Sequence, residues 1–198
     1  MQTATHDTPA TQREPNPDPS GRRGAGRDRW LGGGAQLLSE RGPEGLKLHS
    51  LARSIGRTTG SFYHHFAGMA EFREELAANF SGQALRDAQE EAAHDDPIEE
   101  LHRFLHIHER QQVDDLASAM RAWSRSFPPA ARAVEEAEQK LLRYFEGLFR
   151  RLGSTRTTAR AQSVLLFSLG VAGSRPPWRR SAAERRRTIE IILSGSPS

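Results

Sequence analysis

The sequence has no cysteine among its 198 residues, which excludes disulfide bridges and metal sites built from thiolates. It also has no apolar run approaching the roughly 18 residues of a membrane-spanning helix, and no apolar signal segment follows Met1. Lysine is scarce: Lys47 and Lys140 are the two lysines, and arginine supplies the other cations. We therefore expect a cytoplasmic protein with no membrane span and with no cofactor or metal ion.

The net charge of +3 is small, but it is unevenly placed along the chain. Residues 1–66 carry nine Lys and Arg against six Asp and Glu, whereas residues 67–198 carry nineteen of each. A basic patch on an otherwise balanced chain is typical of proteins that bind nucleic acid, because counterion release from phosphates supplies much of that affinity. The alternative is a general preference for arginine, so the charge favours nucleic acid only modestly.

Residues 1–26 contain four prolines, three glycines and no large apolar residue except Met1. Such a segment cannot bury enough surface to offset its ordering entropy, so we expect a disordered tail. The basic end of this tail, Arg22 to Arg27, is either a solvated segment or an arm that reaches into a DNA minor groove.

Beyond residue 27 the sequence shows no sustained alternation of period two, while apolar residues recur at spacings of three and four. We expect an all-α fold of about nine helices, at about 28–41, 48–55, 58–65, 69–92, 98–108, 116–127, 130–152, 164–171 and 182–193. The first helix contains the run Gly32-Gly33-Gly34, and each glycine costs about 1 kcal/mol relative to alanine. That helix must therefore depend on packing.

Residues 48–66 predict two short helices joined by a glycine-containing turn. The first ends at Gly56, and its apolar face consists of Leu48, Leu51, Ala52 and Ile55. Thr58 is a natural N-cap for the second helix, which runs to about His65. Two helices joined in this way form a helix-turn-helix, whose second helix reads the major groove of DNA.

The second helix has two faces suited to that role. Phe62 and Phe66, one turn apart, anchor it inward, and Gly60 lets the DNA backbone come close because it has no side chain. Its outward face offers hydroxyl groups and hydrogen-bond donors to bases and phosphates, from Thr58, Thr59, Ser61, Tyr63 and His64.

At these residues the sequence resembles the TetR family of bacterial repressors. The matching pattern runs from Leu37-Leu38-Ser39-Glu40-Arg41-Gly42 through Leu48, Leu51-Ala52 and Gly56 to Gly60-Ser61-Phe62-Tyr63-His64-His65-Phe66. The resemblance covers residues 28–80 and, more weakly, residues 121–153. It implies an N-terminal three-helix helix-turn-helix domain at 27–80, followed by a helical effector-binding and dimerisation domain at 81–194.

The resemblance also implies which residues touch double-stranded DNA. Tyr63 meets a phosphate, Thr59 and His64 are placed for base edges, and Ser50 lies beside the DNA backbone. The complete expected set is Lys47, His49, Ser50, Arg57, Thr58, Thr59, Gly60, Ser61, Tyr63 and His64.

Three residues depart from the family pattern. Lys47 stands where a Thr or Ser usually caps the first short helix, and its ammonium group can contact phosphate instead. Arg57 replaces the apolar residue that commonly follows the turn glycine, so we expect its side chain to extend outward and contact DNA. Met69 stands where a lysine often binds phosphate, so we expect that contact to be missing.

Aromatic residues in the C-terminal half allow two interpretations, since they line an effector cavity or fill the core. At helical spacing the core is the more common role. The candidate effector-binding residues are Phe104, His108, Trp123, Phe127 and Phe145. His102, His106 and His108 with Glu99 have a spacing that can bind zinc or nickel, but solvated or pocket-lining histidines are the favoured interpretation.

The family resemblance places a homodimer interface at about 155–193, where each chain gives two helices to a four-helix bundle. Residues 164–171 are apolar nearly all round, which is more apolar surface than one chain of this size needs to cover. The alternative is a helix that is fully buried within one chain.

Together these patterns predict a ligand-responsive repressor that binds a palindromic operator as a dimer and responds to an unidentified small-molecule effector. One alternative is a helical protein–protein interaction module with degenerate DNA binding. Another is a small enzyme that uses His102, His106 and Asp114 or Asp115 as acid–base groups. No nucleophile elbow, phosphate loop or metal triad accompanies these residues, so we expect no enzymatic activity.

Overall fold

The computed structural model describes residues 19–80, 83–110, 113–173 and 181–194, and every regular element within them is helical. The all-α prediction is confirmed. The elements are α1 (Pro19–Arg41), η1 (Pro43–Gly45, a 3₁₀ turn), α2 (Leu48–Ser54), α3 (Thr59–Phe62), α4 (Met69–Phe80), α5 (Gln83–Ala92), α6 (Pro97–Arg110), α7 (Val113–Ser124), α8 (Pro128–Arg151), α9 (Arg156–Gly173) and α10 (Ala182–Ser194).

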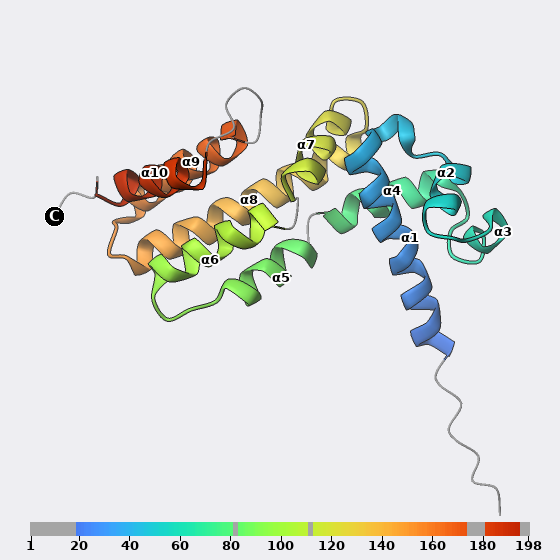
Figure 1. The fold of residues 1–198 in the computed structure, drawn as a ribbon, viewed down its shortest axis with the longest axis horizontal. Coiled ribbons are helices and arrows are strands. Elements are labelled where there is room, and N and C mark those ends of the chain that lie inside the picture. Colours follow the sequence, from blue (N-terminus) through green and yellow to red (C-terminus); the bar gives the residue numbers. More distant parts are fainter. Residues whose placement is uncertain (1–18, 81–82, 111–112, 174–180, 195–198) are drawn as a thin grey trace, which may run out of the picture.

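Several boundaries differ from the expected ones: α3 ends at Phe62 instead of near His65, and α9 begins at Arg156 instead of near residue 164. Helix α1 begins at Pro19, inside the segment predicted to be disordered, so that prediction is wrong for 19–26, while residues 1–18 lie outside the described residues. Proline suits the first turn of a helix because the N–H it lacks has no partner there. The single helix expected at 69–92 is two helices, α4 and α5, which are drawn as separate ribbons in Figure 1. They separate because α4 packs on α1 and α8, whereas α5 packs on α6.

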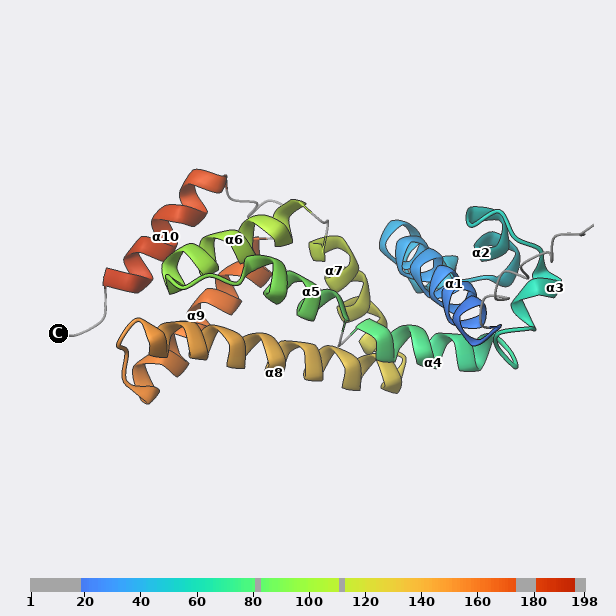
Figure 2. The same cartoon turned by 90° about the horizontal axis from the view of Figure 1, so that it is seen from below.

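Helix α8 runs along the molecule from α9 and α10 at one end to α4 and α7 at the other (Figure 2). Its buried residues fall into two groups: Ala130, Ala133 and Val134 near its start, and Phe145, Leu148 and Phe149 near its end. Each group belongs to a different hydrophobic core. The long helix is therefore the rigid link between the two halves of the chain.

The first core, which we call the head core, holds the helix-turn-helix together. It joins α1, α2, α3 and α4 to Met120 and Trp123 of α7 and to the first turns of α8. The second core joins α5, α6, α9 and α10 to the last turns of α8. The head core thus extends beyond residue 80, and the two short helices α2 and α3 share buried side chains with α7 and α8.

The glycine run in α1 lies where α1 meets its neighbours most closely. A Cβ atom at Gly33 would lie 2.2 Å from Cγ2 of Ile55, and one at Gly34 would lie 2.6 Å from Cζ of Phe72. A Cβ atom at Gly32 would meet nothing within 4 Å. The expected dependence of this helix on packing is therefore confirmed at two of the three glycines.

Candidate DNA-binding surface

The recognition helix α3 has four residues and cannot be stable in isolation, since a short helix gains too few hydrogen bonds to offset nucleation. Its start is capped as expected: the Thr58 hydroxyl oxygen accepts a hydrogen bond from the Ser61 N–H at 3.3 Å. The Ser61 hydroxyl in turn donates to the Thr58 carbonyl at 2.9 Å. The preceding helix α2 ends before Gly56, whose φ of 64° lies in the left-handed region that favours glycine.

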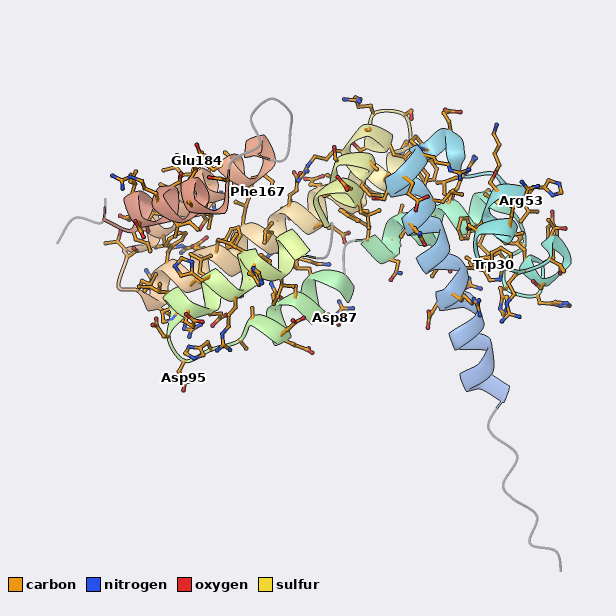
Figure 3. The ribbon with its side chains drawn as sticks, in the orientation of Figure 1. Trp30, Arg53, Asp87, Asp95, Phe167 and Glu184 are labelled. Carbon is orange, nitrogen blue, oxygen red and sulfur yellow. The ribbon has the colours of Figure 1, made fainter. Side chains whose placement is uncertain are left out.

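Buried aromatic rings hold this short helix in place. Phe62 has no exposed surface and packs edge-on against Trp30 of α1, with ring centroids 5.3 Å apart. It also stacks on Phe66 at 5.1 Å and meets Phe72 of α4 at 5.7 Å. Trp30 lies between α1 and the two short helices (Figure 3). The expectation that Phe62 and Phe66 anchor the helix inward is confirmed.

The opposite side of α3 is open to solvent. Tyr63 is 61% exposed, and its ring packs edge-on against Phe62 at 5.4 Å, so the base of the side chain is fixed while the remainder is accessible. None of the ten expected DNA-contacting residues is buried. Seven are exposed and three are half-buried, the latter being Ser50, Thr59 and Ser61.

Positive charge on this surface is not neutralised by neighbouring acids. Within the described part of the chain, Lys47, Arg53 and Arg57 form no ion pair, and all three are exposed. Lys47 occupies the N-cap of α2 without making a side-chain capping bond, as expected from its residue type. Arg29 of α1 donates to the Ile55 carbonyl at 3.1 Å and so occupies the C-terminal end of α2.

Arg27 was not recognised from the sequence as part of this site. Its guanidinium donates to both carboxylate oxygens of Glu75, to Glu71 at 3.1 Å and to the carbonyl of His65. Its Cζ atom also lies 4.4 Å from the centroid of the Phe66 ring. The interpretation of Arg27 as part of a flexible minor-groove arm is therefore wrong, because its side chain is bound inside the head.

The two carboxylates complete this network from α4. Glu71 accepts a hydrogen bond from the Ala67 N–H at 2.5 Å as well as from Arg27. The Ala67 N–H and then Arg27 lower the pKa of Glu71, and the hydrogen bond to Glu75 raises the pKa of Arg27. These shifts keep Arg27 and Glu71 charged near neutral pH, and two carboxylates face one guanidinium. No periodicity would have revealed this, since Arg27 and Glu75 lie on different helices.

Met69 is half-buried and packs against the head core. A thioether cannot pair with phosphate, so the missing phosphate contact at this position stays a prediction.

The five candidate effector-binding residues do not come together at one place. Trp123 and Phe127 stack at 4.7 Å beside the head core, whereas Phe104 and Phe145 meet edge-on at 5.7 Å in the second core. The side chain of His108 lies outside the described residues. Trp123, Phe104 and Phe145 are buried and Phe127 is half-buried, as core residues would be.

A polar cluster around the buried Glu100 lies between α6 and α8. The Glu100 carboxylate accepts hydrogen bonds from the Tyr144 hydroxyl at 3.0 Å and from Arg151 at 2.5 Å. Arg151 also donates to the carbonyls of His94 and Asp95 and so ties α8 to the connection before α6. Burial, and then the bond to Glu100, raises the pKa of Tyr144 well above its usual range. Every member of the cluster has a partner, so it is suited to fixing helix positions.

His102 is half-buried, His106 and Asp115 are exposed, and the side chain of Asp114 lies outside the described residues. In the described part of the chain, no three His, Asp or Glu side chains are grouped closely enough to hold a metal ion.

Helix α9 is not fully buried within one chain. Val164 is 47% exposed and Leu165 is 55% exposed, while Leu166 and Ser163 on the opposite face are buried. The interpretation of this segment as a helix buried within one chain is therefore wrong.

None of the helices in the described ranges is long and apolar enough to cross a bilayer.

Comparison with known proteins links the head to one family. The sequence model of the family described as bacterial regulatory proteins, tetR family, matches residues 31–76, which contain α2, α3, the C-terminal part of α1 and most of α4. No curated protein matches the chain.

Solved structures share the fold beyond the head. A transcriptional regulator from a Rhodococcus species has a TM-score of 0.68 at 16% identity, covering 86% of this chain and 95% of that chain. The TetR family transcriptional regulator PfmR from Thermus thermophilus has a TM-score of 0.58 at 22% identity, covering 86% and 100%. The multidrug binding protein EbrR, solved with imidazole, has a TM-score of 0.58 at 16% identity, covering 87% and 95%. These likenesses show that one fold extends over most of each chain.

Proposed function

We propose that the chain, whose residues 31–76 match the tetR family of bacterial regulatory proteins, is a ligand-responsive repressor that binds a palindromic operator as a homodimer. The main support for this proposal is the way α3 is packed. Phe62 fixes its inner face in an aromatic core, and its outer face is exposed to solvent. A rigid, exposed helix of this kind can enter the major groove without first being ordered.

In this proposal the residues of the head divide into two roles. Thr59 and His64 read base edges, and Tyr63 contacts a phosphate. Around them Lys47, His49, Ser50, Arg57, Thr58, Gly60 and Ser61 meet the DNA backbone or allow its close approach. The exposed and unpaired cations support this division, since phosphate contacts position a protein on DNA while base contacts specify the sequence.

Dimerisation through residues 155–193 supplies the second recognition helix. The exposed apolar side chains of Val164 and Leu165 on α9 support this assignment, because burying them against a second copy removes apolar surface from water. A symmetric dimer then presents two copies of α3 to successive major grooves, roughly 34–36 Å apart.

We place the effector in the C-terminal domain, residues 81–194, with the head at 27–80. The related fold of EbrR, a multidrug binding protein solved with imidazole, supports binding of a small molecule there. Phe104 and Phe145 are candidates for its lining, with Trp123 and Phe127 at the junction with the head. Since the head core includes parts of α7 and α8, an effector that shifts these helices alters the spacing of the two heads.

Selection of duplexes from a random DNA pool with purified protein at near-physiological salt tests this function. The proposal expects enrichment of a palindromic sequence, with two protomers on each duplex by sedimentation. Weak, salt-sensitive binding without sequence enrichment would favour a protein–protein interaction module instead. The proposed role needs no enzymatic turnover, and access to the chromosome requires a cytoplasmic location.

A further inference from the structure

We propose that Arg27 is a positioning residue for DNA reading: it ties the turn after the recognition helix to α1 and α4, without contacting DNA itself. This inference rests on the proposed DNA-binding function. It concerns the contacts of one guanidinium with Glu71, Glu75, Phe66 and the carbonyl of His65.

The contacts of Arg27 and Glu71 lie at the turn that follows α3. The Phe62 carbonyl at the end of α3 accepts from the N–H groups of His65 and Phe66, so the groups of the turn beyond Phe62 need partners elsewhere. Arg27 binds the His65 carbonyl, while Glu71 binds the Ala67 N–H. The two side chains that bind this turn are therefore joined to each other through the Arg27–Glu71 pair.

Helix α1 approaches the same turn closely. A Cβ atom at Gly26 would lie 2.6 Å from Cε1 of His65, so the imidazole packs directly on the backbone of α1. Arg27, the next residue, places its guanidinium on the Phe66 ring. The turn is thus clamped by α1 from one side and by α4 from the other. Movement of this turn would rotate α3, because Phe66 stacks on Phe62.

Arg27 and Arg57 differ in how their positive charge is compensated. Arg27 faces two carboxylates, Glu71 and Glu75, so its positive charge is compensated within the head. Arg57 has no such partner among the described residues and is exposed. The two arginines therefore act differently on DNA: Arg57 attracts phosphate, and Arg27 orders the reading helix.

The guanidinium is also required by geometry. Two parallel bonds to Glu75, one bond to Glu71 and one to the His65 carbonyl use the planar fork of arginine. Lysine would keep the charge, but its single ammonium group cannot make this set of bonds.

The experiment measures affinity for a selected palindromic duplex and for a mixed-sequence duplex of equal length, each over a range of salt concentration. The variants are Arg27→Gln, Arg27→Lys, Arg57→Gln, Glu75→Gln and, as a matched control, Glu74→Gln, whose exposed carboxylate is the next residue along α4. Titrations are run well below the unfolding midpoint of the least stable variant, so that every variant is fully folded.

The positioning role predicts that Arg27→Gln and Arg27→Lys both lose about tenfold or more in affinity for the selected duplex and little for the mixed one. Their salt slope stays that of the parent, whereas Arg57→Gln loses about 0.9 in slope, as expected for one phosphate contact. Glu75→Gln is decisive in sign. Removing an acid raises DNA affinity by simple electrostatics, as Glu74→Gln should do slightly, whereas loss of the tether lowers it.

Rescue by Arg27→Lys, a reduced salt slope in Arg27→Gln, or a gain in affinity in Glu75→Gln would overturn the inference. Amide hydrogen exchange gives a readout that is independent of DNA. Arg27→Gln should accelerate exchange at Phe66 and Ala67 while leaving α6 unchanged, and unaltered exchange there would also refute the tether. If the parent protein enriches no duplex but exchange accelerates as expected, the proposed function fails and the tether stands.

Discussion

Replacing the three consecutive glycines of α1 one at a time by alanine tests the packing of the head. All three substitutions gain the same intrinsic helix stability, about 1 kcal/mol for alanine over glycine. Differences among the three variants therefore report what each new methyl group meets. Gly32→Ala meets nothing within 4 Å, so it should stabilise the protein by up to about 1 kcal/mol.

The other two methyl groups meet buried or constrained atoms. At Gly33 the new Cβ lies 2.2 Å from Cγ2 of Ile55, an atom bonded directly to the Ile55 Cβ that cannot move away without a rotamer change or a shift of α2. At Gly34 the new Cβ lies 2.6 Å from Cζ of Phe72, whose ring is fully buried. Overpacking of this kind costs about 1–3 kcal/mol, so both variants should be less stable than Gly32→Ala by that amount.

Thermal unfolding followed by helical circular dichroism provides the assay. For a chain of this size each kcal/mol moves the midpoint by about 2–4 °C, so Gly32→Ala should melt above the parent and the other two below Gly32→Ala. In an Ile55→Ala background, which removes Cγ2, the penalty of Gly33→Ala should largely disappear. Equal midpoints for Gly32→Ala and Gly33→Ala would refute the packing argument.

Three further outcomes follow from the described contacts. Thr58→Ala removes the N-cap of α3, so it should cost about 1 kcal/mol locally, and an unchanged exchange rate at the Ser61 amide would argue against the cap. Burial raises the pKa of Tyr144 above its ordinary 10.0, so above that pH the folded protein keeps a proton that the unfolded chain loses. The free energy of unfolding should therefore fall as the pH rises past 10.0. The variant Tyr144→Phe should show a smaller fall in its unfolding midpoint over the same pH range. Leu165→Glu should convert the proposed dimer to a monomer in sedimentation velocity. The control Ser118→Glu, at an exposed site on α7, should remain a dimer. If both variants are dimers, the interface lies elsewhere.

The DNA-reading unit was predictable because its signals are local. The turn at Gly56, the cap at Thr58 and the spacing of Phe62 and Phe66 all lie within one short segment, and the structure agrees with each of them. The early start of α1 was missed, since the proline and glycine content of the tail argued against a helix there.

Long-range arrangements were beyond the reach of pattern alone. The Arg27 tether joins residues 48 positions apart, and nothing in the helical period marks the partner. The aromatic residues proposed for the effector site had the correct type but unknown separation. Phe127 and Phe145 lie at opposite ends of a helix that rises about 1.5 Å per residue, so about 27 Å separates them along its axis. They therefore belong to two cores.

Whether the outer face of α3 reads DNA can be tested by one titration. The selected palindromic duplex and a scrambled duplex are titrated at physiological salt with the parent protein and with the Thr59→Ala/Tyr63→Ala variant, both side chains being accessible in the structure. We expect the parent protein to bind the palindromic duplex at least about 10³ times more tightly than the scrambled one. The variant should lose most of this preference while unfolding at a similar temperature. A variant that retains the preference would contradict the assignment of the reading surface to α3.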